Sequence, residues 1–127
     1  MKIINPSSLA EPRGYNHGIA SGNFLFIAGQ IGWNEKGEIA NGLVAQFDRA
    51  LANITAVLDS AGTSAEKIVR LTIFIKDKED YMNHRKEIGQ VYRKHFGKHF
   101  PAMSLLIVKD LLEAGALVEI EATAETK

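Results

Sequence analysis

Cysteine is absent from this chain, and its absence removes several classes of chemistry at once. Without thiols the protein forms no disulfide, carries no thiolate nucleophile and offers no sulfur ligand to a metal. No apolar run approaches the roughly 18 residues that a membrane-spanning helix needs. Residues 1–6 also lack the long apolar segment of a signal peptide. We therefore expect a cytoplasmic protein with no membrane partner.

Net charge is lacking as well, because fifteen basic side chains balance fifteen acidic ones. Without an overall field, the chain has no general attraction to nucleic acid, and we expect none as a partner. The sequence also shows no platform of aromatic and basic side chains of the kind that binds RNA. What is present, 46% hydrophobic and 24% charged residues, is typical of a folded domain. The length fits one domain over residues 1–127.

The first third of the chain predicts an extended leader followed by a hairpin. Residues 5–14 are rich in proline, serine and glycine, and two apolar segments follow at 17–20 and 24–31. The Gly-Asn pair between them is a hairpin signal. Alternation along the second segment places Leu25, Ile27 and Ile31 on one face, and Phe24, Phe26, Ala28 and Gln30 on the other.

The remaining segments predict two helices and three strands. Apolar residues at steps of three and four predict a helix of about five turns, closed by Gly62, with Val44, Phe47, Leu51, Ile54 and Leu58 on its buried face. A strand follows over 69–76, and a second helix begins at Asp77 or Asp80 and ends before Gly97. Two further apolar runs form the last strands. This order predicts an α+β fold, with two helices packed on one face of a mixed sheet.

Two carboxylates in the last apolar run are the most informative local feature. Glu119 and Glu121 are two positions apart on a predicted strand, so they share one face, and the apolar residues between and around them share the other. Acidic side chains are seldom central to an apolar strand unless that face is wet, paired or used.

Several segments, in order and spacing, resemble the reactive-intermediate deaminase family, also called the RidA or YjgF-like family. They are residues 14–19 (GYNHGI), 28–31 (AGQI), 46–54, 61–62, 68–69, 74, 77, 80–81, 100–102 (FPA) and 118–122 (VEIEA). The resemblance implies a chorismate-mutase-like α+β fold, assembled as a homotrimer with the sheets in an inner barrel. It also implies small-molecule clefts between subunits, and hydrolysis of imines or enamines to a ketone and ammonia without a metal or an organic cofactor.

The chain departs from the family pattern at the residue after the proline-alanine pair. An arginine is common there and grips the substrate carboxylate with two hydrogen bonds, but this chain has Met103. A thioether neutralises no anion. The family's usual serine and asparagine are replaced by Ala28 and Arg85. The resemblance therefore implies a divergent member with an altered substrate class.

The resemblance assigns Glu121 as the catalytic carboxylate, which positions the water that attacks the imine carbon. The alternative is a strand carboxylate paired with a basic residue across a subunit boundary. For Glu119 we favour an ion pair or a subunit contact. Tyr15 either covers the ligand and donates a hydrogen bond or packs against a neighbouring subunit.

His17 and Arg85 are the candidates to compensate for Met103, with Arg13 as a weaker third; otherwise each lies on the surface. Gln30 is a further candidate for substrate binding, although such a residue more often satisfies buried backbone groups. Trp33 forms a pocket wall or an interface plug. Met103 and Leu105 make the pocket more apolar, which favours an uncharged or aromatic ligand.

Other chemistries have little support in the sequence. The histidines show no metal-ligand spacing with carboxylates, so we expect no metal site. The ribonuclease activity attached to some relatives is disfavoured by the missing RNA platform. The leading interpretation is an imine or enamine deaminase. The alternative is a non-catalytic trimer that binds a small molecule.

Overall fold

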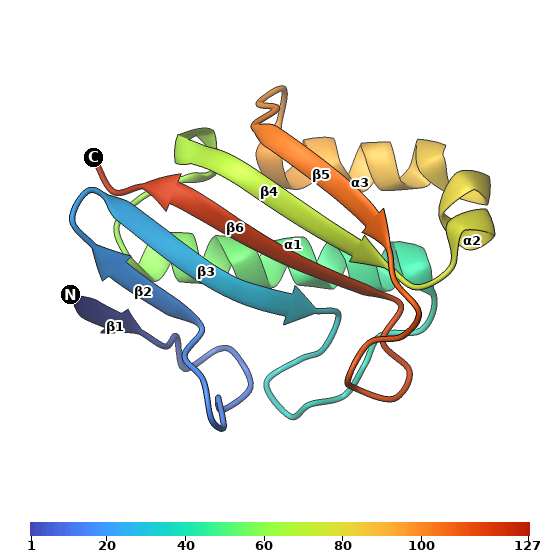
Figure 1. Cartoon of the computed structure of the whole chain (residues 1–127), viewed down its shortest axis with the longest axis horizontal. Helices are drawn as coiled ribbons and strands as arrows, with labels where there is room; N and C mark the ends of the chain where they lie inside the picture. Colours follow the sequence, from blue (N-terminus) through green and yellow to red (C-terminus); the bar gives the residue numbers. More distant parts are fainter.

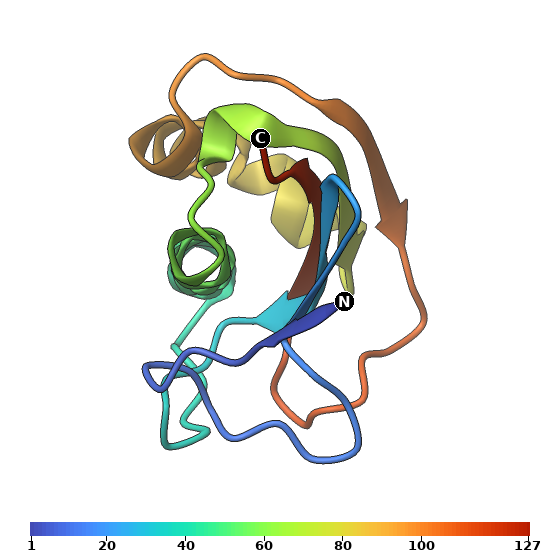
Figure 2. The ribbon, with the colours of Figure 1, turned by 90° about the vertical axis from the view of Figure 1, so that its left-hand side faces the viewer.

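The computed structural model describes residues 1–127 and shows a six-stranded mixed sheet with its helices on one face (Figure 1, Figure 2). The strands are β1 (Lys2–Ile4), β2 (Gly18–Ser21), β3 (Phe24–Ile31), β4 (Ile68–Ile75), β5 (Ala102–Ile107) and β6 (Val118–Glu125). Their order across the sheet is β1-β2-β3-β6-β4-β5, and β4 with β5 is the parallel pair. The predicted α+β class and mixed sheet are confirmed.

The helices are α1 (Leu43–Ser60), α2 (Lys78–Asn83) and α3 (Arg85–Phe96), with a short 3₁₀ helix, η1 (Ala65–Lys67), before β4. The predicted apolar stripe of α1 is buried against the sheet, and Ile54 is fully inaccessible. After Ala61 the chain turns at Gly62, whose φ of 75° is a conformation that glycine adopts without strain.

The second predicted helix begins at Asp77, whose side chain accepts a hydrogen bond from the Asp80 N–H. The helix is not continuous, because it breaks at His84. The His84 N–H donates a hydrogen bond to the Tyr81 carbonyl, three residues back. The ring Nδ1 of His84 donates instead to the Asp80 carbonyl, at 2.8 Å. A side chain has replaced the backbone donor at that carbonyl, and α3 starts afresh.

A β-bulge in β3 changes which residues share a face. Ile27 pairs with Ala122 but Gln30 pairs with Ile120, so β3 has one extra residue between these positions. Gln30 therefore turns to the helix side of the sheet, and Ile31, which pairs with Glu119, turns away from it. The predicted grouping of Ile31 with Leu25 and Ile27, and of Gln30 with the opposite face, was wrong, because strict alternation does not survive a bulge.

The core lies between α1, α3 and the sheet, and 22 buried residues form one hydrophobic cluster there. Strand β6 occupies the middle of the sheet, between β3 and β4 (Figure 1). No helix covers the other face of the sheet (Figure 2), where Phe26 is 50% exposed. β1, which the sequence did not predict, extends this sheet by pairing with β2. None of the helices combines the length and apolar character that crossing a bilayer requires.

Candidate functional site

The two carboxylates of β6 lie on the helix-free face, as alternation predicted. Val118, Ile120 and Ala122 are buried, whereas Glu121 is exposed and Glu119 is half-buried. Glu119 sits between Ile31 of β3 and Phe74 of β4. The five ion pairs of the protomer involve neither glutamate, so Glu119 does not form the ion pair expected of it within one protomer.

Glu119 opens into a hollow of about 300 Å³ that it shares with Tyr15 and Trp33. The β-bulge forms one wall, and Gly29 gives the carboxylate its space. A Cβ on Gly29 would stand 2.7 Å from Cδ of Glu119, well inside van der Waals contact. The missing side chain at Gly29 therefore lets the Glu119 carboxylate lie against β3.

The electrostatics of this hollow raise the pKa of two of its side chains, Glu119 and Tyr15. Burial, and after it the charge of Glu121, raises the pKa of Glu119 above its ordinary value. Burial, followed by the charges of Glu113 and Glu119, raises the pKa of Tyr15, so its phenol remains a donor at neutral pH. A carboxyl with a raised pKa that shares a hollow with a hydrogen-bond donor is typical of proton-transfer sites.

Tyr15 lines the same hollow as Glu119 and not that of Glu121, the glutamate to which the sequence analysis gave the catalytic role. Glu121 lines a separate hollow of about 270 Å³ with Asn16 and Phe26, and Ala28 is common to both hollows. Geometry and pKa therefore make Glu119 the stronger acid–base candidate. The sequence could not tell which glutamate is the acid–base group, because both lie on one face of the strand. The two side chains differ in burial, and that difference exists only in the folded protein, where the bulge lies next to Glu119.

His17 and Gln30 are buried, and each is about 1% exposed. The Nε2 atom of His17 donates to the Ala10 carbonyl at 2.6 Å, and its Nδ1 accepts from Gln30 Nε2 at 3.1 Å. Gln30 Nε2 also bonds the Ala28 carbonyl. Both ring nitrogens of His17 hold the leader against the bulge and are not free for a ligand in this protomer. Substrate binding by either residue stays a prediction.

Arg85 and Met103 line a different hollow, of about 190 Å³, between α3 and β5. Met103 pairs with Leu71, a fully buried residue, so its side chain points toward the helix layer. Within one protomer these two residues are therefore near each other but on the opposite side of the sheet from Glu119. Arg13 lines a third hollow, with Tyr15 and Trp33.

The 190 Å³ hollow also contains residues that the sequence analysis missed. Arg93 and Gly89 line it, and they follow Arg85 at successive spacings of four. That spacing on a helix places the three on one face, a signal that the sequence already contained. Phe100 and Tyr92 complete the wall. The fold thus assembles a surface of aromatic and basic residues that the sequence analysis did not anticipate.

The histidines of the α3 region are engaged in separate structural contacts. His95 Nε2 bonds Asp48 of α1, and His99 Nε2 bonds the Ile68 carbonyl at 2.7 Å. No group of three or more histidine, aspartate and glutamate side chains lies together in the way that metal ligands do.

Comparison with known proteins supplies the family. The family model described as Endoribonuclease L-PSP matches residues 6–126. A RutC family protein of Pyrococcus horikoshii is 37% identical, over 97% of this chain and 96% of its own. The YjgF gene product of E. coli has a TM-score of 0.87 at 32% identity, with all of both chains covered. E. coli TdcF with bound serine has a TM-score of 0.85 at 31% identity, with 98% of both chains covered.

These matches extend over nearly the whole chain and include both the fold and the segments around the candidate residues. The chain belongs to the Endoribonuclease L-PSP family, and the RidA or YjgF-like membership predicted from the sequence is confirmed.

Proposed function

We propose that the protein is a cytoplasmic hydrolytic deaminase that converts a reactive imine or enamine to a ketone and ammonia. The observation that carries the proposal is Glu119, a half-buried carboxyl with a raised pKa and no ion-pair partner, beside the Tyr15 phenol. Family membership supports the same reaction class. A ribonuclease would instead need a phosphate-binding surface around these groups, and Glu113, Glu119 and Glu121 make this region acidic.

In the proposed reaction, water adds to the imine carbon while the Glu119 carboxylate accepts a proton from it. That proton then goes to the nitrogen and gives a carbinolamine. The carbinolamine hydroxyl next loses its proton, which the Glu119 carboxylate carries to the amine as the C–N bond breaks, so that ammonia leaves and the C–O bond becomes the ketone carbonyl. Tyr15 donates a hydrogen bond to the ligand and covers it. Glu121 holds the pKa of Glu119 high through its charge. The direct role predicted for Glu121 is the alternative within this mechanism.

A homotrimer with ligand clefts between subunits is part of the proposal. The candidate residues lie on two sides of one protomer, with Glu119 and Tyr15 on one side and Arg85 and Met103 on the other. A neighbouring copy is the simplest way to bring the two sets to one ligand. The uncovered sheet face, with Phe26 half exposed, supports such an association.

The rival is a trimer of the same family that binds a small molecule without turnover. Met103 favours it, because no guanidinium stands where the carboxylate grip is expected. A relative, TdcF, is described with bound serine, which is consistent with a small amino-acid-like ligand. The altered residue supports a changed substrate class under either function.

The test is ammonia release from a panel of enzymatically generated imines. We expect Glu119→Gln to lower turnover about 100-fold or more, the range for losing an acid–base group. Glu121→Gln should have a smaller effect, and Glu125→Gln, on the same face of β6, is the matched control. Binding without turnover in the parent protein would favour the rival. Equal loss in all three variants would exclude a specific proton carrier. Sedimentation would measure the oligomeric state.

A further inference from the structure

The hollow between α3 and β5 has features that neither the fold nor the proposed proton transfer requires. Its volume is about 190 Å³, and eight of its eleven lining residues are hydrophobic. The only charged residues that line it are Arg85 and Arg93, and no acidic residue does. An apolar cavity of about 150 Å³ in another protein holds benzene. This hollow is therefore large enough for one aromatic ring.

The two arginines form an uncompensated positive pair. They lie four residues before and four residues after Gly89, on the face of α3 that borders the hollow. Neither guanidinium makes an ion pair or a side-chain hydrogen bond within the protomer. A Cβ on Gly89 would approach Nη1 of Arg93 to 3.3 Å, so the glycine makes room for that guanidinium. Charge complementarity here calls for an anion.

Two aromatic rings line the same hollow as the two arginines. Tyr92 and Phe100 are stacked, with centroids 5.6 Å apart and planes 6° from parallel. The Tyr92 hydroxyl donates to the His99 carbonyl at 2.6 Å, which holds the pair in place. Phe100 nevertheless remains 67% exposed, and Met103 is 42% exposed. A large apolar side chain ordered by stacking and still open to solvent offers a face for a planar ligand.

We propose that this groove binds an aromatic carboxylate, with the ring against Phe100 and Met103 and the carboxylate between Arg85 and Arg93. The two helix-borne guanidiniums would then take over the anion grip that Met103 cannot provide. The inference names the ligand class and rests on the proposed function only for the claim that this ligand is a substrate. The groove itself needs neither Glu119 nor turnover.

Phenylpyruvate is a suitable probe, because it is the ketone that hydrolysis of an aromatic imine would yield. Calorimetric titration should show one site per protomer and a binding constant at least tenfold stronger than for pyruvate, which lacks the ring. Phenylacetone, which lacks the carboxylate, should also bind at least tenfold more weakly. Affinity for pyruvate or for phenylacetone equal to that for phenylpyruvate would overturn the proposal.

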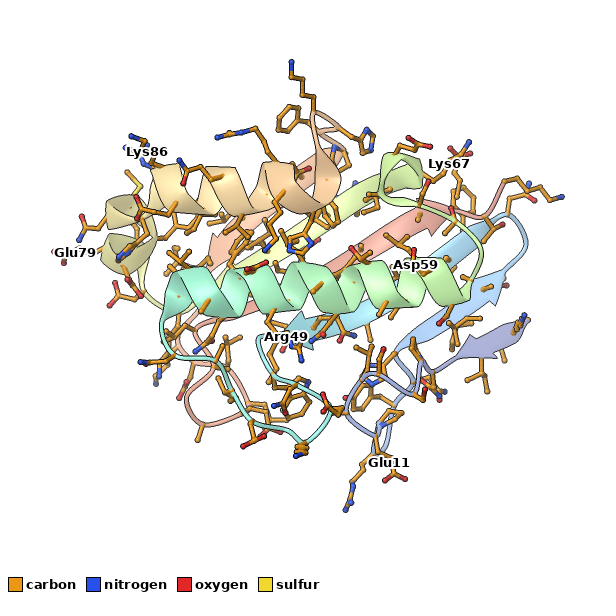
Figure 3. The ribbon with its side chains drawn as sticks, turned by 180° about the vertical axis from the view of Figure 1, so that it is seen from behind. Glu11, Arg49, Asp59, Lys67, Glu79 and Lys86 are labelled. Carbon is orange, nitrogen blue, oxygen red and sulfur yellow. The ribbon has the colours of Figure 1, made fainter.

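Substitutions separate the arginines from a general charge effect. We expect Arg85→Gln and Arg93→Gln each to weaken phenylpyruvate binding about five- to tenfold, a value reduced for solvent exposure. Phe100→Ala should weaken it about two- to tenfold through lost stacking. Lys86 is exposed on the same turn of α3 as Arg85, and its side chain points away from α1 (Figure 3). Lys86→Gln therefore removes a positive charge outside the hollow and should leave phenylpyruvate binding unchanged. Unchanged melting curves confirm that each variant folds.

Glu119→Gln keeps this test independent of catalysis. Retained phenylpyruvate binding with lost turnover supports both proposals, and retained binding in a parent protein that shows no turnover supports this one alone. Binding that is the same in the arginine variants as in Lys86→Gln overturns it. The proposal is also overturned if a single-stranded RNA oligonucleotide binds more tightly than phenylpyruvate and the arginine substitutions abolish that binding. A changed oligomeric state in those variants, without weaker binding by the assembled protein, would assign the arginines to a subunit contact instead.

Discussion

Alanine in place of Gly29, in β3, should impair activity, whereas alanine in place of Gly32, just after β3, should impair stability. A new Cβ at Gly29 would lie 2.7 Å from Cδ and 2.9 Å from Cγ of Glu119. At Gly32 it would lie 2.5 Å from Cβ and 2.7 Å from the carbonyl oxygen of Gln46, which belongs to α1. Non-bonded carbon atoms prefer about 3.5–4.0 Å, so each neighbour must move by roughly 1 Å.

The difference lies in what has to move. At Gly29 the obstacle is a flexible side chain without an ion-pair partner, and turning it away costs about 1 kcal/mol or less. At Gly32 the obstacle is helix backbone. The Gln46 side chain also ties α1 to the Ala40 and Gly115 carbonyls and to the Leu117 N–H. Overpacking of about 1–3 kcal/mol, added to strained hydrogen bonds worth about 1 kcal/mol each, predicts a loss of roughly 3–5 kcal/mol.

The assay combines urea unfolding, followed by circular dichroism, with ammonia release. Gly29→Ala should unfold at nearly the parent urea concentration but lose at least tenfold in turnover, because Glu119 leaves its hollow. Gly32→Ala should lose a large part of a stability that is typically about 5–15 kcal/mol. Equal destabilisation by both substitutions, or parent-like unfolding of Gly32→Ala, would refute this reasoning about backbone and side-chain obstacles.

Two further predictions concern charge. Glu121→Gln removes a charge that raises the pKa of Glu119, so the acid limb of the pH–rate profile should move to lower pH. Asp48 joins α1 to α3: burial opposes its ionisation, but hydrogen bonds from His95 and Lys94 hold its pKa below the usual 3.8. Its stabilisation should therefore be complete above that value and lost as the pH falls through the lower, folded-state pKa. At pH 6, Asp48→Asn should reduce the free energy of unfolding by about 1 kcal/mol, and near pH 2 the two proteins should converge in urea unfolding.

The Glu121→Gln and Asp48→Asn predictions can each be contradicted by one result. An acid limb unmoved by Glu121→Gln would separate the pH profile from Glu119. A stability difference for Asp48→Asn that persists unchanged at the lowest pH would mean that the aspartate acts through packing and not through its ionised contacts.

Local patterns in the sequence were sufficient for most of the elements. Helical spacing located α1, and alternation placed Glu119 and Glu121 on one face, because side-chain direction along a regular helix or strand follows from the backbone repeat alone. Turn residues, such as Gly62, marked where these elements end. Ordered family segments supplied the membership and the fold.

Only the tertiary structure decided how these elements combine into sites. The bulge puts the Gln30 side chain on the opposite face of the sheet from the one that strict alternation predicts, and Gly29 within it leaves space for Glu119. This shift depends on how β3 pairs with β6 and not on the composition of β3. Folding likewise stacked Phe100, which precedes β5, on Tyr92 of α3, so that both rings line one hollow with Arg93. Face and periodicity are local properties of a chain. Burial, pKa and the meeting of side chains depend on which segments pack together, and so they appear only in the folded protein.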